Sequence, residues 1–355
     1  MNLDLTETQS LLRDTVRSYL EGELPYDRIR ELEREGGYDQ GLWKATAQQG
    51  WLGLPFSEER GGAGGSLVDL GLLVEEFARR AAIVPILEVA AIGRILDQRG
   101  EGCDELIAGI LTGDALPVPA LWEGAACDGE LTVRAEQGTL TGAKAFVDYG
   151  QVATHHVAAA RDGLYLVDTR TQGSECTPLR SIGRTPLCHV RYEGAPARRV
   201  AGPGAMAETI RLGRSLAAVQ IVGAMQQALD MTVAYVKIRE QFGVPIGSFQ
   251  AVRHHAANMA IRIESSRLLA YEALDAIDRG AASDAQVAHA KASASRAAPE
   301  VTMLAHQLHG GNGIIEENDL YFYTLRAKEH SLAWGSFDEC MAVVADQVHV
   351  DSDWF

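Results

Sequence analysis

Three glycines within four positions, in the stretch HQLHGGNGIIEEN at residues 306–318, form the first group whose spacing suggests a binding site. Gly310, Gly311 and Gly313 would let backbone N–H groups approach an anion that a side chain would otherwise block. The positive end of a neighbouring helix would add to that attraction. Glycine also ends helices, and lone glycine motifs are common, so the motif alone favours a turn over a phosphate site.

The hydrophobic pattern divides the chain into three parts that would have to position such a site. Residues 1–112 show helical periodicity, and residues 113–203 alternate apolar and polar positions. Residues 204–355 return to long, alanine-rich helical stripes, which are typical of closely packed helices. We therefore predict an α+β fold with an N-terminal helical domain, a middle antiparallel β domain and a C-terminal helical bundle.

Local signals support this division. Thr6 and Gln9 have the spacing of a capping box, which predicts the start of a helix. Gln137-Gly138 and Asp162-Gly163 each lie between apolar runs, which predicts two tight turns between strands.

Composition and charge exclude several classes of protein. The chain has 355 residues and a formal net charge of -16, which argues against binding to nucleic acid or to an anionic membrane surface. Its five cysteines form no C-x-x-C pair, so we expect neither a disulfide framework nor a zinc site. The N-terminus shows no signal peptide, and the most apolar helical stretch, residues 216–225, is too short for a bilayer. We expect a cytoplasmic protein that binds no metal.

Two C-terminal segments carry a family resemblance. VKIREQFGVPIGSFQAVRHHAANM, residues 236–259, contains an Arg-x-x-Phe-Gly…Gln pattern, and HQLHGGNGI, residues 306–314, contains Gln-x-x-Gly-Gly-x-Gly. Together they resemble the two signature segments of the acyl-CoA dehydrogenase family. QQGWLGLPFSEERGGAGGS, LTGAKAFVDYG and RLGRSLAAVQIVGAMQQALDMTVAY are similar to other family segments, in the family's order. The resemblance covers nearly the whole chain.

This resemblance implies FAD as the cofactor and an acyl-CoA thioester as the substrate. In the family these segments hold the ADP half of FAD across a dimer interface, while the flavin ring lies mainly in the neighbouring subunit. Arg239 is a permanent cation that can contact a pyrophosphate with two N–H groups, and glutamine amides can donate neutral hydrogen bonds. The cofactor-binding residues that the resemblance implies are Arg239, Gln241, Phe242, Gln250, Gln307, Leu308, Gly310 and Gly311.

The glutamate that the family uses as its catalytic base is missing. Its commonest position, at a fixed distance after the glycine motif, is occupied by Trp334, whose indole cannot take a proton. Some members place the base on an earlier helix, before an arginine, and that position here is Gly213. Asp338 and Glu339 lie nearby in sequence, but a shift of four or five positions turns a side chain elsewhere, so we predict no catalytic residue in this chain.

The segments that contact the flavin ring in the family are also altered. The usual Thr-Glu-Pro…Gly-Ser-Asp segment corresponds to VPALWEGAACDGE, where only Pro119, Gly124 and Asp128 retain some similarity. The later Trp-Ile-Thr segment is replaced by Phe146-Val147-Asp148. A carboxylate close to the reduced flavin would repel its negative charge, so we expect Asp148 to be turned outward.

The altered residues are therefore those that would serve this chain's own flavin ring and catalysis, whereas the residues that would hold a neighbour's ADP are kept. This pattern resembles the degenerate subunit of heteromeric acyl-CoA dehydrogenases of bacterial steroid degradation, in which a glutamate-bearing paralogue supplies the base. The resemblance implies a heterotetramer with two copies of each chain, and it makes a steroid side chain a candidate acyl group of the acyl-CoA substrate. Electron-transfer flavoprotein is the expected electron acceptor.

Two alternatives remain open from the sequence. The chain could be a homo-oligomeric flavoenzyme of altered chemistry that uses Asp148, Asp338, His254 or His255 as its base. The paired histidines lie beside the FAD segment and are better explained as structural. A flavin-free scaffold or acyl-CoA binder is the non-enzymatic alternative, but it leaves the intact ADP motif unexplained.

Overall fold

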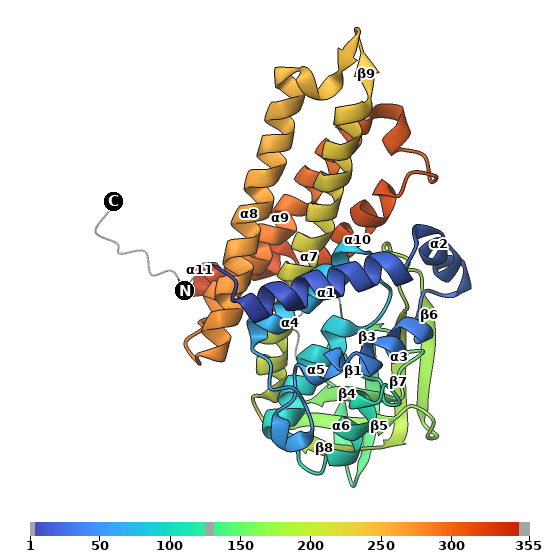
Figure 1. Cartoon of the computed structure of the whole chain (residues 1–355). Coiled ribbons are helices and arrows are strands. Elements are labelled where there is room, and N and C mark those ends of the chain that lie inside the picture. Colours follow the sequence, from blue (N-terminus) through green and yellow to red (C-terminus); the bar gives the residue numbers. More distant parts are fainter. Residues whose placement is uncertain (1–3, 125–130, 348–355) are drawn as a thin grey trace. The chain divides into compact units, whose positions relative to one another are not determined.

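The computed structural model describes residues 4–124 and 131–347 (Figure 1). By its internal contacts the chain forms two compact units, and the boundary between them falls between Gly213 and Arg214. The division into three domains at residues 112 and 203 stays a prediction. Asp128, one of the residues of the altered flavin segment, lies outside the described residues.

The first unit begins with helices. They are α1 (Glu7–Glu23), α2 (Tyr26–Glu35), α3 (Gln40–Gln48), α4 (Leu67–Arg79), α5 (Ile86–Arg99) and α6 (Asp104–Leu111), with 3₁₀ turns η1 (Trp51–Gly53) and η2 (Glu58–Arg60). The predicted capping box is present: the Gln9 backbone N–H donates to Thr6 Oγ1, and the Thr6 N–H donates to Gln9 Oε1. Ser66 and Asp69 form the same motif at the start of α4, so the glycine-rich stretch before it is a connector.

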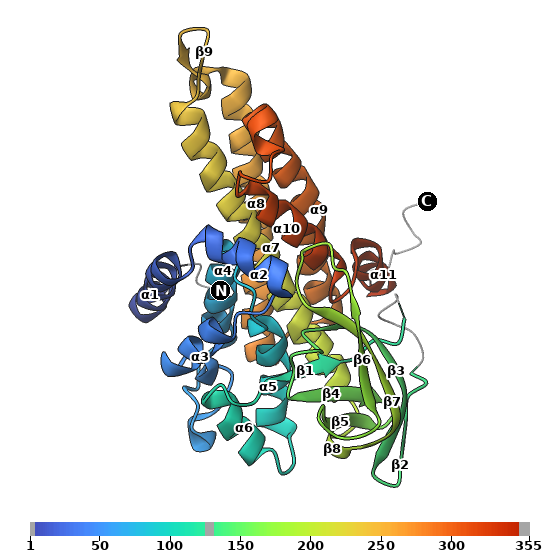
Figure 2. The same ribbon diagram turned by 90° about the vertical axis from the view of Figure 1, so that its right-hand side faces the viewer.

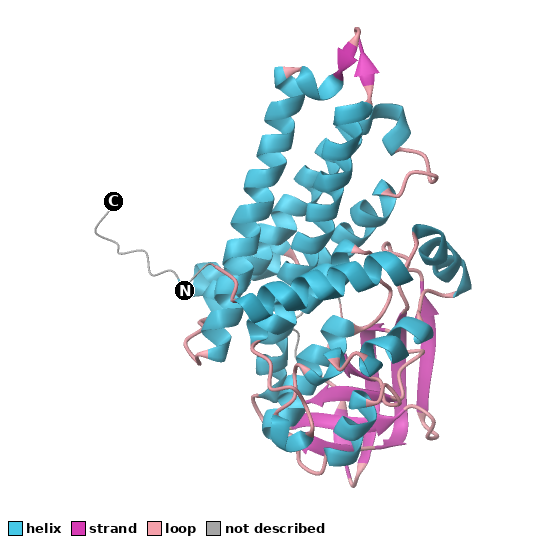
Figure 3. Ribbon diagram, in the orientation of Figure 1, coloured by secondary structure: helices cyan, strands magenta, loops and turns pink. Residues whose placement is uncertain are grey.

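The strands that follow form two four-stranded sheets (Figure 3). The strands are β1 (Pro117–Ala120), β2 (Arg134–Glu136), β3 (Thr139–Asp148), β4 (His155–Ala160), β5 (Gly163–Asp168), β6 (Ser174–Leu179), β7 (Leu187–Pro196) and β8 (Arg198–Ala201). One sheet has the order β1-β4-β5-β8 and the other β2-β3-β7-β6. All pairings are antiparallel except β1 with β4. Figure 2 shows these strands from the side.

The two predicted turns are both present. Gln137 and Gly138 have φ values of 50° and 79°, as a two-residue hairpin turn requires, and they connect β2 to β3. The second hairpin connects β4 to β5 through Arg161 and Asp162, with Gly163 as the first residue of β5. The turn residues Gln137 and Gly138 therefore fix the register of the first hairpin, whereas the second turn lies one residue earlier than the predicted Asp162-Gly163 pair.

A buried ion pair holds the segment after β1. Lys144 Nζ, fully buried on β3, lies 2.8 Å from Glu123 Oε1 and 3.1 Å from the Leu121 carbonyl. The Glu123 carboxylate also accepts bonds from the backbone N–H groups of Thr132 and Val133. Burial alone would raise the pKa of Glu123, but these bonds together lower it.

We predict that Glu123→Gln destabilises the fold by about 2–3 kcal/mol, because the buried ammonium of Lys144 loses its counter-charge. The effect should be present above the unfolded pKa of about 4.5 and should fade as the pH falls through the lowered folded value. Urea unfolding at several pH values measures it. Asp114→Asn, which breaks the exposed Lys44–Asp114 pair, is the matched control and should change little. Equal effects of both variants would contradict the assignment.

The second unit consists of long helices and one small hairpin. Its elements are α7 (Ala205–Ile238), β9 (Glu240–Gln241), β10 (Val244–Pro245), η3 (Ile246–Ser248), α8 (Gln250–Asp278), α9 (Asp284–His309), η4 (Gly310–Gly313), α10 (Leu320–Leu332) and α11 (Phe337–Gln347). α7 begins in the first unit and crosses the boundary. Buried alanines such as Ala273, Ala290 and Ala294 line the helix contacts, which allows the helices to pack closely.

These elements confirm the predicted α+β fold, with helices before and after a mostly antiparallel β region. Within the described residues, no helix is both long and apolar enough to cross a membrane.

Candidate functional site

The predicted FAD segment forms the hairpin between α7 and α8, at one end of the helical unit (Figure 1). Gln241 pairs with Val244 and Glu240 pairs with Pro245, so Phe242 and Gly243 form a two-residue turn. Both turn residues have positive φ values, 54° and 79°, as in a type I′ turn. Gly243 adopts this conformation without strain, whereas Phe242 does not, because its Cβ crowds the backbone there.

The side chain of Phe242 is 93% exposed and that of Ile238, at the end of α7, is 78% exposed. Phe249 is partly exposed, and its ring meets that of Phe242 edge-on, 6.1 Å between centroids. A strained turn that presents apolar side chains to solvent is unfavourable for an isolated chain. These residues make the hairpin a candidate contact surface.

Arg239 lies at the base of this hairpin, where its carbonyl accepts from the Ile246 backbone N–H at 2.8 Å. Its exposed guanidinium makes no ion pair or hydrogen bond with any residue of 4–124 or 131–347. Gln250 is the first residue of α8, is exposed, and follows Phe249, which provides no side-chain cap. A cation and the open N-terminus of a long helix thus lie at the same hairpin, as anion binding requires.

The glycine motif lies where α9 ends. Gly310 has a φ of 59° and caps the helix, and Gly310–Gly313 form the 3₁₀ turn η4. A Cβ added at Gly310 or Gly311 would meet nothing within 4 Å, so the space above both residues is open. Gln307 is exposed on the last turn of α9, whereas Leu308 is nearly buried. Leu308 therefore contributes packing and backbone rather than an exposed side chain.

A ring stack joins the two motifs. The rings of Tyr235 on α7 and His309 on α9 lie 4.5 Å apart with planes 18° from parallel. His309 Nδ1 is 2.8 Å from the Ala305 carbonyl, and burial lowers the pKa of this histidine, which favours the neutral ring. Because Tyr235 is one turn before Arg239 and His309 directly precedes Gly310, the stack brings both motifs to the same end of the helices.

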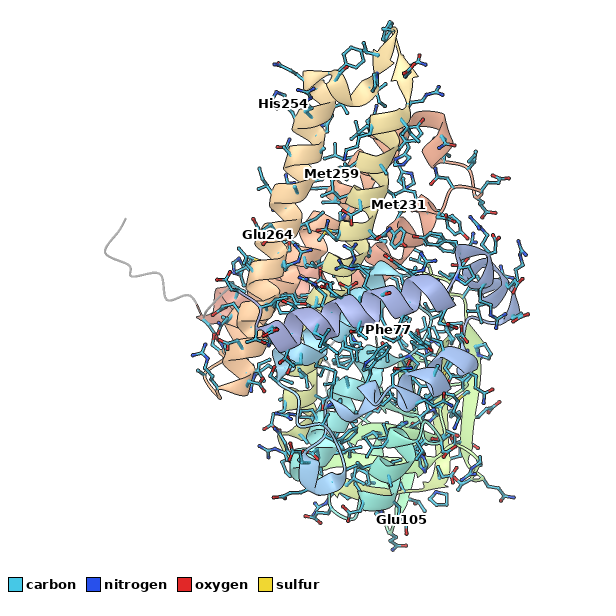
Figure 4. The ribbon with its side chains drawn as sticks, viewed as in Figure 1. Phe77, Glu105, Met231, His254, Met259 and Glu264 are labelled. Atoms are coloured by element: carbon cyan, nitrogen blue, oxygen red, sulfur yellow. The ribbon has the colours of Figure 1, made fainter. Side chains whose placement is uncertain are left out.

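The two histidines at 254 and 255 follow the hairpin on the first turns of α8. His254 is exposed and lies near the hairpin end of the helix in Figure 4, whereas His255 is partly buried. No cluster of three His, Cys, Asp or Glu side chains that could hold a metal occurs in the described part of the chain. Among residues 4–124 and 131–347, neither histidine has a hydrogen-bond or ion-pair partner that would orient it as a base.

The position of the missing glutamate is a rigid turn between α10 and α11. Trp334 is only 5% exposed and has a φ of 61°, a strained value for a bulky residue. Arg214 Nε donates to the Trp334 carbonyl at 3.0 Å. Lys291 Nζ, fully buried, donates to the carbonyls of Ser331 and Gly335 at 3.2 and 2.9 Å. These two cations thus hold three backbone carbonyls of the turn.

The acidic residues that follow this turn are not directed into it. Glu339 and Ser336 form a capping box: the Ser336 N–H donates to Glu339 Oε2 at 2.7 Å, and the Glu339 N–H donates to Ser336 Oγ at 3.3 Å. Asp338 is exposed on the first turn of α11. Gly213, the alternative base position, is buried on α7 and has no side chain to offer.

The altered flavin segments lie in the β region of the first unit. Phe146 has a φ of 53° at an irregularity in β3, and its ring, 43% exposed, lies 5.4 Å from that of His189. Val147 is buried and Asp148 is partly exposed. The VPALWEGAACDGE stretch begins with the buried strand β1, and its Glu123 serves the ion pair with Lys144.

Several of these residues could not be recognised from the sequence. Lys291 resembles any helical lysine until the fold brings it to residues 331–335, and the strain at Phe242 and Trp334 is visible only in the backbone. A Phe-Gly pair between a helix and a Val-Pro stretch is a weak turn signal that could have indicated the hairpin.

Comparison with known proteins identifies the family. Residues 6–100 match the family model "Acyl-CoA dehydrogenase, N-terminal domain" and residues 201–349 match "Acyl-CoA dehydrogenase, C-terminal domain". The chain is 33% identical over 325 residues to "Acyl-CoA dehydrogenase IpdE2" of Mycolicibacterium smegmatis, covering 91% of this chain and 93% of that protein. The chain belongs to the acyl-CoA dehydrogenase family.

Solved structures of acyl-CoA dehydrogenases have the same fold. A variant of the "Tcur3481-Tcur3483 steroid ACAD" is 30% identical, with a TM-score of 0.90 over 96% of this chain and 97% of that one. The ChsE4-ChsE5 complex from Mycobacterium tuberculosis is 26% identical, with a TM-score of 0.90 over 99% of this chain and 100% of that one. The chain is therefore related to steroid-degradation acyl-CoA dehydrogenase subunits, as the sequence predicted.

FAD is the cofactor of this acyl-CoA dehydrogenase family, and the residues at the hairpin end fit part of it. The exposed Arg239, the uncapped start of α8 and the open space above Gly310 and Gly311 suit a pyrophosphate. The assignment of individual cofactor contacts stays a prediction.

Proposed function

We propose that this chain is the glutamate-lacking subunit of a heteromeric, FAD-dependent acyl-CoA dehydrogenase. It pairs with a glutamate-bearing paralogue in a heterotetramer with two copies of each chain. Its hairpin and glycine turn hold the ADP half of the FAD whose flavin ring lies in the partner. The observation that carries this proposal is the exposed, strained Phe242 turn beside an unpaired Arg239, among the described residues, on a chain whose base position holds a buried tryptophan.

Charge and hydrogen-bonding capacity support the cofactor role. Arg239 can neutralise a pyrophosphate with paired N–H groups, and the first N–H groups of α8 can add to it. Gln250 and Gln307 are exposed and free, within the described chain, to donate to the neutral part of the nucleotide. Gly310 and Gly311 admit a close approach of the ligand to the backbone.

The turn at Trp334 supports the proposal that the partner subunit supplies the catalytic base. The contacts from Arg214 and Lys291 hold the backbone at residues 334–335, and Trp334 occupies the sequence position of the family's glutamate. Asp338 cannot replace it without moving that turn, and Glu339 is used in its capping box. The proton at the substrate α-carbon must then be taken by a carboxylate of the partner, while bound FAD supplies hydride acceptance from the β-carbon.

The substrate class follows from the related steroid enzymes and is part of this proposal. A chain that lacks its own base and flavin contacts leaves room beside the partner's site, which suits an acyl-CoA with a bulky polycyclic acyl group. Electron-transfer flavoprotein is the electron acceptor we expect for the complex, from the family resemblance. No described residue assigns its docking surface.

Phe242→Gly separates the assembly role of the hairpin from its folding role. Glycine relieves the positive-φ strain but adds chain entropy, so the free energy of unfolding of the isolated chain should change by less than about 1 kcal/mol. Removal of an aromatic anchor from an interface should weaken association with the glutamate-bearing paralogue by about 30-fold, or roughly 2 kcal/mol. Analytical ultracentrifugation of the mixed chains measures it.

The control is Ile182→Gly, because Ile182 is an exposed apolar residue in a loop of the first unit. Leu11 is also exposed, but it lies within a helix, so Leu11→Gly would not be a suitable control. Ile182→Gly should leave association unchanged. Unaltered association in Phe242→Gly would remove the hairpin from the interface and contradict the proposal.

A further inference from the structure

Two cysteines on adjacent strands of the β region form a cluster that the dehydrogenase chemistry does not use. Cys176 lies on β6 and Cys188 on β7, and both are reduced. In the β6–β7 register Cys176 faces Val190 and Cys188 faces Pro178, so the cysteines are diagonal neighbours two residues apart. Side chains two residues apart share a face, so both thiols lie on the same side of the sheet.

The surroundings of the two sulfur atoms overlap. Cys176 Sγ lies 3.5 Å from the Gly150 carbonyl, and Cys188 Sγ lies 3.6 Å from the Val147 carbonyl. A Cβ added at Gly150 would lie 2.5 Å from Cys188 Sγ, so this glycine leaves the space that the second thiol occupies. The two sulfur atoms are thus packed against the same short segment, residues 147–150, where β3 ends.

A histidine of the other sheet completes the cluster. His156 on β4 is fully buried, and its Nε2 lies 3.0 Å from the Gly150 carbonyl and 3.9 Å from Cys176 Sγ. A carbonyl only accepts, so Nε2 carries the proton and can also donate to a Cys176 thiolate. The hydrogen bond between the two thiols lowers the pKa of Cys176 despite its burial, and His156 lowers it further. The same hydrogen bond raises the pKa of Cys188.

Buried polar atoms around the thiols provide an independent observation. His156 Nδ1, Tyr192 Oη and Ser174 Oγ are all buried and have no hydrogen-bond partner within the described chain. Ser174 faces Tyr192 in the β6–β7 register, and the Tyr192 ring meets the His156 ring at 6.1 Å. Unsatisfied hydroxyls beside a thiol can bind the oxygen atoms of a small polar molecule or of an oxidised sulfur.

Access and position give the two cysteines different roles. Cys176 is partly exposed on β6, the edge strand of its sheet, whereas Cys188 is fully buried on β7. A peroxide therefore reaches Cys176 first. Diagonal positions are farther apart than a disulfide prefers, but an edge strand has only one neighbour and can move to close the distance.

We propose that Cys176 and Cys188 are a peroxide-oxidisable thiol pair, in which Cys176 is attacked first and Cys188 resolves it to a reversible disulfide. The Cys176 thiolate attacks one oxygen of hydrogen peroxide, the O–O bond breaks, and a sulfenic acid and hydroxide form. The Cys188 thiol then attacks the sulfenic sulfur, the S–O bond breaks, and water leaves with the proton. Two thiols and one peroxide thus give one disulfide and two waters, and a dithiol such as dithiothreitol reverses the reaction.

The test treats the purified full chain with a few equivalents of hydrogen peroxide and maps its tryptic peptides without reduction. The cysteines fall in separate peptides, residues 171–180 and 185–191, so a disulfide joins the two and dithiothreitol separates them. In Cys188→Ser, the sulfenic acid should persist and be captured by dimedone at Cys176. Cys176 should be oxidised at least about tenfold faster than the buried Cys103 and Cys340, whose thiol pKa values are raised by burial.

Cys340→Ser is the matched control and should leave the joined peptides unchanged. If the cysteine variants fold poorly, the wild-type map decides alone, because it needs no substitution. Equal oxidation of Cys103, Cys176 and Cys340, or oxidation of Cys176 to sulfinic acid without the joined peptides, would overturn the proposal.

Discussion

Replacing Arg239 with alanine is expected to weaken FAD binding by the heteromeric complex by about 10- to 100-fold. Hydrogen bonds to charged groups contribute about 1.5–3 kcal/mol each, and a factor of ten corresponds to about 1.4 kcal/mol. Arg239 makes no ion pair with a described residue, so its loss leaves no buried charge and should not disturb the fold. Fluorescence titration of the FAD-depleted complex measures the change, and unfolding of the isolated chain should be unaltered.

Arg279→Ala is the matched control for this experiment. Arg279 is an exposed arginine at the far end of α8, where it pairs with Asp275 at 2.8 Å. Arg279→Ala removes the same charge at the C-cap of α8 without touching the hairpin, so FAD affinity should stay the same. Equal losses in both variants would mean that net charge, and not a contact at Arg239, governs FAD binding.

Replacing the catalytic glutamate of the partner subunit with glutamine should lower the dehydrogenation rate of the complex by roughly 10²–10⁴-fold. This range is typical for removal of a general base. The prediction follows from the absence of any suitably placed carboxylate at the Trp334 turn of this chain, as far as the structure describes it. Single-turnover reduction of FAD by the acyl-CoA substrate measures the step without product release.

Asp338→Asn and Asp148→Asn in this chain are the controls for that prediction. Both remove the carboxylates that the alternative flavoenzyme would use, and both residues are at least partly exposed. The rate of the complex should remain within about twofold of the wild type, because the proposed base belongs to the partner subunit and neither carboxylate takes the proton. A loss comparable to that of the partner's glutamine variant would support a base in this chain.

Local patterns predicted much of the fold because local interactions create it. The capping box at Thr6, the turn at Gln137-Gly138 and the apolar stripes of the long helices each depend on residues a few positions apart. The order of helices, strands and helices followed from these signals. Likewise, the family motifs around Arg239 and Gly310 indicated these two segments as a candidate cofactor site.

Features that depend on distant contacts were not predictable. The anchoring of the Trp334 turn needs Lys291, which is more than forty positions earlier, and nothing distinguishes that lysine in the sequence. The thiol cluster needs the register of β6 on β7 together with His156 from the other sheet. The strain at Phe242 arises because β9 pairs with β10 in a register that places Phe242 in a two-residue turn with a positive φ.

The ratio of FAD to protein tests the central claim most directly. The chain should be purified alone and after co-expression with a glutamate-bearing acyl-CoA dehydrogenase paralogue, and flavin absorbance compared with protein concentration. We predict no bound flavin in the chain alone. In the complex we predict about one FAD per pair of unlike chains, because each pair keeps one of two possible cofactor sites. One FAD per chain in the isolated protein would contradict it, because that result requires a complete cofactor site in a homo-oligomer.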